Sequence, residues 1–191
     1  MPLDFSAMMR AVCVDLTRRL PELAHVQMDR IGVGYRQARA RVPHGLQASL
    51  TPLRFRDGAI TERRGRRVYG CPRVLGDDGR ELLYLLNFYL PRFLDHALEE
   101  KLTTIVHELW HVSPAMDGDL RRHDGRCYAH GHSQQDYDAH AAGLAKRWLS
   151  ADPPTGVYAF LEVNFEELVQ EHGGVSGRRF RVPRLAPLAA A

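Results

Sequence analysis

The chain has 191 residues, of which 45% are hydrophobic and 26% charged, a composition typical of folded proteins and unlike that of disordered or collagenous chains. The 26 basic and 23 acidic residues leave a net charge of only +3. No stretch approaches the roughly 18 consecutive apolar residues that span a bilayer, and the N-terminus lacks a signal-peptide pattern. These features predict one cytoplasmic domain without membrane association. The three widely spaced cysteines indicate neither a disulfide framework nor a cysteine-based zinc site.

The N-terminal half predicts a helix followed by strands. Residues 4–20 carry apolar side chains at spacings of three and four, and Pro21 ends this amphipathic helix. Segments rich in Val, Ile, Leu and Tyr then predict strands within 26–42, 46–55, 66–74 and 81–90. The dipeptides Asp57-Gly58 and Asp78-Gly79 favour tight turns, so we expect hairpins there and a mostly antiparallel sheet.

The C-terminal half predicts mainly helices. Residues 95–112 place apolar side chains on one helical face, with Asp95 as the expected N-cap. A second helix is expected over 133–149, with Tyr137 and Trp148 facing inward, and Pro153-Pro154 ends it. A last strand or helix pair extends to about residue 182. We therefore expect a single domain over 1–185 and a flexible tail over 186–191.

The predicted helix 95–112 contains the sequence His107-Glu108-Leu109-Trp110-His111, an H-E-x-x-H motif. At about 100° per residue, the two histidines project from one face, one turn apart, where they can bind one metal ion. Glu108 beside them can act as the general base of a metallopeptidase. The frequencies of His and Glu predict only about 0.03 chance matches to this motif. We therefore interpret it as a zinc site and not as two buried core histidines, which would need hydrogen-bond partners.

A catalytic zinc also needs a third protein ligand and an open position for water. The residues after His111 offer five candidates: Asp117, Asp119, His123, His130 and His132. Asp117 has the spacing of the metzincin ligand, but Pro114 stands where the metzincin turn requires glycine. His130 directly precedes the helix predicted over 133–149, which would hold a ligand rigidly. We favour His130, with His123 and Asp117 as the alternatives.

The motif and the residues after it resemble a known group of enzymes. H-E-x-x-H followed about twenty residues later by His130-Gly131 and a helix resembles the SprT-like zincin metallopeptidases, and residues 107–131 are also similar to metallopeptidases of bacteria and their phages. The resemblance covers about residues 107–149. It implies a zinc-dependent peptidase that acts on a peptide or protein substrate, with His107, His111 and His130 as zinc ligands and Glu108 as base.

Together these features predict an α+β, zincin-like domain. We expect an N-terminal helix, a mostly antiparallel sheet, the H-E-x-x-H helix and a supporting helix. Strand 81–90 would border the cleft, where an extended peptide would dock by main-chain hydrogen bonds. Zinc would lower the pKa of water to about 7, and Glu108 would take its proton. Tyr128 or Tyr137 would be placed to donate to the oxyanion.

Two alternatives come from other classes of function. In a zinc-stapled regulatory module, two of His123, His130 and His132 would complete a closed site with His107 and His111, and Glu108 would be idle. In a SprT-like protease acting on DNA-associated proteins, the arginine clusters at 63–67 and 178–181 would contact nucleic acid. We do not favour DNA binding, because the charge is nearly balanced and few aromatic residues accompany the arginines.

Asp117, Asp119 and Asp124 are expected to support turns, and Cys127 to be a small buried residue.

Overall fold

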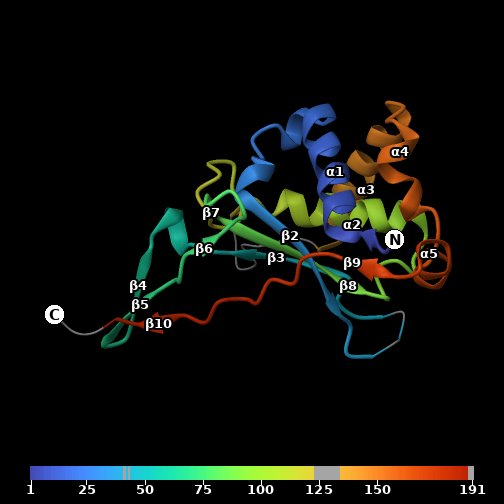
Figure 1. The fold of residues 1–191 in the computed structure, drawn as a ribbon. Coiled ribbons are helices and arrows are strands. Elements are labelled where there is room, and N and C mark those ends of the chain that lie inside the picture. Colours follow the sequence, from blue (N-terminus) through green and yellow to red (C-terminus); the bar gives the residue numbers. More distant parts are fainter. Residues whose placement is uncertain (41, 43, 123–133, 189–191) are drawn as a thin grey trace.

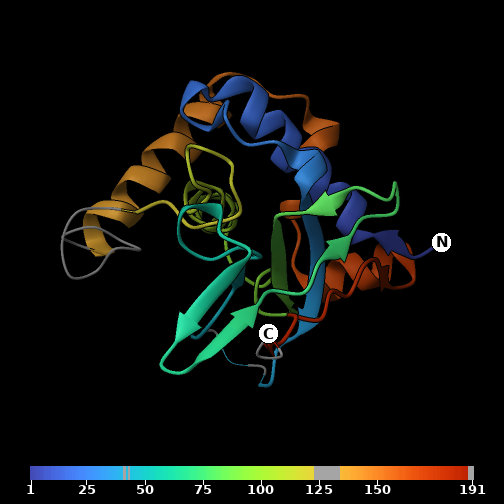
Figure 2. The same ribbon diagram turned by 90° about the vertical axis from the view of Figure 1, so that its left-hand side faces the viewer.

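The computed structural model describes residues 1–40, 42, 44–122 and 134–188, which form a mixed α+β structure (Figure 1). Helices lie on one side of a small central sheet, and the C-terminal segment crosses its other side (Figures 1 and 2). The helices are α1 (Phe5–Arg19), α2 (Leu98–Trp110), α3 (Gln134–Ser150), α4 (Thr155–Tyr158) and α5 (Phe165–His172). The strands are β1 (Leu3–Asp4), β2 (Ile31–Gln37), β3 (Ala48–Pro52), β4 (Thr61–Arg64), β5 (Arg67–Gly70), β6 (Val74–Leu75), β7 (Glu81–Leu82), β8 (Tyr84–Leu90), β9 (Val175–Ser176) and β10 (Ala186–Pro187).

The central sheet has the order β2-β8-β3, with β2 parallel and β3 antiparallel to β8. Among the described residues the other strands form three small sheets, β1-β9, β10-β5-β4 and β6-β7, and an isolated bridge joins Val112 to Leu120. The prediction of mixed α and β structure is confirmed. Four of the six strand pairings among the described residues are antiparallel, as expected, but the strands divide among separate sheets and the central sheet is mixed.

The first helix agrees with the sequence pattern. The carboxylate of Asp4 caps α1 by accepting a hydrogen bond from the Ala7 amide at 3.0 Å. Pro21 follows its C-cap residue, Leu20. Because apolar residues recur at helical spacing, α1 buries Phe5, Met9, Val12, Cys13 and Leu16.

The main core lies between the central sheet and the helices. Alternate residues of β8, namely Tyr84, Leu86 and Phe88, are fully buried on that face of the sheet. The opposite face has a smaller apolar cluster, in which Leu85 of β8 packs with Leu53, Leu82 and the half-buried Phe180. A sheet with apolar residues on both faces needs a cover on each side, and the C-terminal segment supplies the second.

The two Asp-Gly turns have different outcomes. Asp78-Gly79 lies in the loop between the antiparallel strands β6 and β7, so the expected hairpin is confirmed. Asp57 and Gly58 both have positive φ, at 55° and 75°, but the hairpin expected there is wrong. The strand before this turn, β3, pairs with β8, and β4 after it pairs with β5. A tight turn fixes the local chain direction, whereas burial on the core selects the partner strand.

Residues 178–188, here called the C-terminal strap, cross the second face of the sheet (Figure 1). The Tyr35 amide donates to the Arg178 carbonyl at 2.9 Å, and the Leu188 amide donates to the Val68 carbonyl at 2.8 Å. Ala186 and Pro187, where the flexible tail was expected to begin, pair with β5. No helix within the described part of the chain is long and apolar enough to cross a membrane.

Candidate metal centre

Helix α2 carries the H-E-x-x-H motif, with His111 as its C-cap residue, and packs its apolar face into the core. Leu102, Ile105, Val106 and Leu109 are fully buried, as the periodicity predicts. The helix begins later than expected, at Leu98, with Ala97 as its N-cap, so the assignment of Asp95 as the cap is wrong. The preceding turn buries Phe93 and Leu94, and the Asp95 carboxylate instead accepts a hydrogen bond from the Phe165 amide at 3.3 Å.

His107 and His111 converge as the motif predicts. Their Nε2 atoms lie 3.1 Å apart, and their rings meet edge to face with centroids 4.9 Å apart. His111 is buried and His107 half-buried. The pair therefore directs two ring nitrogens toward one point at the surface of the core.

The opposite ring nitrogens of both histidines contact consecutive residues of α3. The Asp138 carboxylate lies 2.9 Å from Nδ1 of His107, and the Tyr137 hydroxyl lies 3.1 Å from Nδ1 of His111. The Tyr137 ring also stacks on His111 at an interplanar angle of 24°. A carboxylate at Nδ1 favours the tautomer whose Nε2 lone pair is available to a metal. Tyr137 thus contacts a histidine of the motif, and its contact with an oxyanion stays a prediction.

Glu108 lies on the sheet side of the histidine pair. Its carboxylate accepts a hydrogen bond from the Leu50 amide of β3 at 2.6 Å. Burial raises the pKa of Glu108 to about 7, and the hydrogen bond from Leu50 lowers it in part. A carboxyl group with a pKa near neutrality is suited to exchanging protons in catalysis.

The strand beside α2 is the edge strand β3. Gln47, just before β3, donates a hydrogen bond to the Glu100 carboxylate and accepts one from the Thr104 hydroxyl, each at 2.9 Å. The Leu50 amide donates to Glu108. Strand 81–90, which was expected to border the cleft, forms β7 and the central strand β8, whose two sides pair with β2 and β3. That expectation is wrong, because a strand paired on both sides has no backbone groups left for a peptide.

The aspartates after the motif support the chain locally. The Asp117 carboxylate accepts from the Asp119 amide at 3.1 Å. Asp119 is buried, accepts from the Asp57 and Leu120 amides, and pairs with Arg122 at 2.8 Å. These contacts fit the expected role in turns.

The remaining sequence candidates lie outside the described residues: His123, Asp124, Cys127, Tyr128, His130 and His132. Within the described ranges no three His, Cys, Asp or Glu side chains are grouped to hold a metal ion. The described part of the site therefore supplies two converging imidazoles and a base, and the choice of His130 as third ligand stays a prediction.

Sequence reasoning missed Asp138 and the Leu50 amide. Asp138 follows the inward-facing Tyr137 by one residue, so the helical periodicity of α3 predicts that its side chain faces solvent. The Leu50 contact is made by a backbone amide, which every residue except proline has, so no residue type in the sequence indicates it. Both contacts arise only when α2 packs between α3 and β3.

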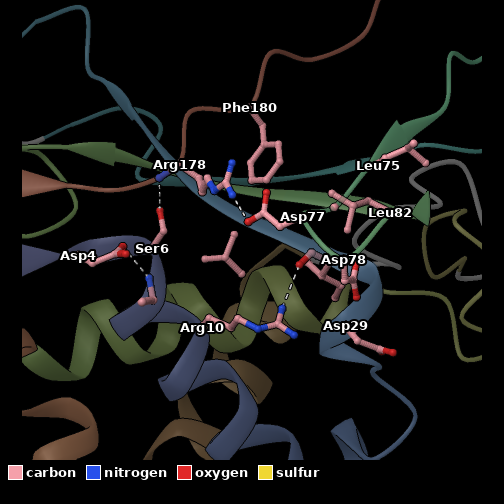
Figure 3. Close-up of a pocket in the computed structure, with 15 residues that line it drawn as sticks. Asp4, Ser6, Arg10, Asp29, Leu75, Asp77, Asp78, Leu82, Arg178 and Phe180 are labelled. Carbon is pink, nitrogen blue, oxygen red and sulfur yellow. Dashed lines mark hydrogen bonds and ion pairs between the residues drawn. The ribbon is translucent and has the colours of Figure 1, made fainter. Parts of the chain in front are cut away.

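A pocket of 370 Å³ lies away from this site, between the start of α1, the start of β2, the β6–β7 loop and the strap (Figure 3). Phe180 and Leu82 form an apolar side, and an ion pair between Arg178 and Asp77 closes part of its rim (Figure 3). None of the motif residues lines it. The pocket and the histidine pair are therefore separate features.

Comparison of the chain with protein-family models, with curated proteins and with solved structures finds no match. The motif and the geometry around it are therefore the features that bear on function.

Proposed function

We propose that this protein is a zinc-dependent metallopeptidase of zincin-like architecture, with His107 and His111 as zinc ligands and Glu108 as general base. The observation that carries the proposal is the 3.1 Å approach of the two Nε2 atoms, each opposite an Nδ1 with its own polar contact. In this arrangement a shared proton or a shared metal ion must occupy the space between the two lone pairs.

The donor pair fits zinc. With Zn–N distances of about 2.0 to 2.1 Å and tetrahedral angles, two nitrogen ligands lie about 3.3 Å apart. The observed Nε2 separation of 3.1 Å is close to that value. Imidazole nitrogens are among the usual ligands of zinc, and His130 is the proposed third ligand, with His123 as the alternative. Asp117, the other candidate from the sequence, is not grouped with the histidine pair in the described part of the chain.

The chain's own groups account for the proton handling. Zinc, when bound, supplies a Lewis acid that polarises a carbonyl and increases the acidity of water. Glu108 accepts the proton of the attacking water and passes it to the leaving amine. The Leu50 amide holds the Glu108 carboxylate in place at 2.6 Å, and burial excludes competing water from it.

Zinc content tests the metal part of the proposal. We expect about one zinc per purified chain, lost in His107→Ala and in His111→Ala, because each variant removes one ligand. His130→Ala should lose zinc far more readily than His123→Ala, and the reverse order would transfer the third position to His123. Elemental analysis that finds no zinc in the wild type, and no uptake on addition, would refute the site.

Glu108→Gln tests catalysis separately. The variant should keep its zinc and its fold but lose about 10² to 10⁴ in the rate of peptide cleavage, since the amide cannot act as a base. Cleavage of an unfolded protein or a peptide library measures this. A variant as active as the wild type would exclude Glu108 as base. Zinc that stays bound to a closed site with four protein ligands would favour the zinc-stapled module instead.

A further inference from the structure

Positive charge is concentrated on the β4–β5 hairpin and the strap. Residues 61–70 contain four arginines and one glutamate, a net charge of +3, and residues 178–188 contain four arginines and no acid, a net charge of +4. Because the whole chain has a net charge of only +3, the rest of it carries −4. The near balance of positive and negative charges in the whole sequence therefore does not reveal that positive charge is concentrated in these two segments. The two segments, here called the basic arm, are joined where β10 pairs with β5.

The basic arm extends away from the helices (Figures 1 and 2). Five of its exposed arginine side chains have no hydrogen bond or ion pair among the described residues: Arg63, Arg66, Arg67, Arg181 and Arg184. Most described arginines outside the arm are engaged, as in the Arg54–Glu81 pair and the contact of Arg121 with the Trp110 carbonyl. The arm therefore presents guanidinium groups that the fold itself does not use.

Protection of a sheet edge does not account for this pattern. Charged residues on a free edge discourage aggregation, which would explain Arg63 on the edge strand β4. Arg67, however, lies on β5, whose other edge pairs with β10 at Tyr69 and Gly70. Arg67 also lies directly opposite Arg64 in the hairpin register, and like charges in that position destabilise a sheet.

We propose that the basic arm binds the phosphate backbone of a nucleic acid. Beyond the β10 pairing the hairpin is a two-stranded β-ribbon, which is narrow enough to lie in or along a groove of the double helix. The guanidinium fork matches phosphate oxygens. The arginines follow one another from the turn at Gly65 along the hairpin and onto the strap, which suits a repeating polyanion. Tyr69 shares the face of Arg67 and Arg64 and offers a half-buried aromatic ring beside them. The proposal is independent of the metal site.

Anisotropy of a labelled 20-base-pair DNA duplex, titrated with the full chain at several salt concentrations, tests the proposal. The test variant is Arg63→Gln/Arg66→Gln/Arg67→Gln. The matched control, Arg18→Gln/Arg39→Gln/Lys146→Gln, removes three exposed charges elsewhere. A third variant, Arg63→Lys/Arg66→Lys/Arg67→Lys, keeps the charge. Circular dichroism checks that all of them fold.

We expect wild-type binding with Kd of about 10⁻⁴ to 10⁻⁶ M near physiological salt, weakening as salt rises. The glutamine variant should lose at least about tenfold in affinity, and its log–log salt slope should flatten by about 2 to 3, since each phosphate contact contributes about 0.9. The control and the lysine variant should stay close to wild type. Binding that is absent, or equally weakened in the control, would overturn the proposal. Tighter arm-dependent binding of a polyglutamate peptide would overturn it in favour of an acidic polypeptide partner.

Discussion

The polar contacts behind the histidine pair determine how its rings are oriented. Asp138 contacts Nδ1 of His107, and Tyr137 contacts Nδ1 of His111, so one turn of α3 fixes both imidazoles of α2. A carboxylate that accepts from Nδ1–H makes Nε2 a better metal ligand and holds the ring at the right angle. These two residues therefore act as positioning residues through the histidines.

Asp138→Asn and Tyr137→Phe should each lower zinc affinity by about 10- to 100-fold, because the histidines lose the groups that orient them. Competition with a chromogenic chelator measures the affinity. Asp138 is half exposed, so Asp138→Asn should leave the thermal stability of the zinc-free protein almost unchanged. Asp29→Asn, which removes an exposed carboxylate paired with Arg80, is the matched control. Equal zinc affinity in Asp138→Asn and Asp29→Asn would show that Asp138 does not act on the metal.

Helix α2 is also held in place by a buried lysine at its N-terminal end. Lys101 is 1% exposed, and its Nζ donates to the carbonyls of Leu161 and Val163, each at 2.8 Å. Burial lowers the pKa of Lys101 to about 8, although Asp95 and Glu167 raise it in part. The two carbonyls attach the motif helix to the turn between α4 and α5.

The pKa of Lys101 predicts a pH-dependent stability. In the unfolded chain this amine has an ordinary pKa near 10.5, so between about pH 8 and 10.5 the unfolded state binds more protons than the folded state. Stability relative to Lys101→Met should therefore rise with pH across that window, on the order of 3 kcal/mol in total. Urea denaturation of both proteins at pH 7.5, 9 and 10.5 measures this difference. A difference that does not change with pH would show that Lys101 titrates normally.

The elements show what a sequence can predict. The sequence predicts helices α1, α2 and α3 because their apolar residues recur at helical spacing, and these residues are buried in the core. The helix start at Asp95 was wrong because the burial of Phe93 and Leu94 was not visible as a periodic pattern. The motif placed His107 and His111 correctly within one turn, whereas Asp138 and the Leu50 amide belong to other elements. Spacing along one helix is local information, and contacts between elements depend on packing.

At the scale of the whole molecule, the strap connects the C-terminal residues to both the central sheet and the β4–β5 hairpin. It lies close to β2 because glycine occupies the two positions beneath it. A Cβ on Gly34 would lie 2.9 Å from the Arg178 carbonyl oxygen, and one on Gly32 would lie 2.9 Å from the Phe180 ring. The Phe180 ring can move aside, but the Arg178 carbonyl belongs to the backbone that pairs with Tyr35.

Gly34→Ala should therefore push the strap away from the sheet. We expect a loss of about 1 to 3 kcal/mol in the free energy of unfolding, as for other overpacked sites, and faster tryptic cleavage within the arginine-rich residues 178–184. Gly143→Ala is the matched control, because the added Cβ meets no atom within 4 Å in helix α3 and should stabilise the protein by about 0.5 to 1 kcal/mol. Zinc content should stay the same in both, since the strap and the histidine pair lie on opposite faces of the sheet. If Gly34→Ala is as stable as wild type and is cleaved at the same rate, the strap does not need the close approach that the glycine allows, and its contact with β2 contributes little to the fold.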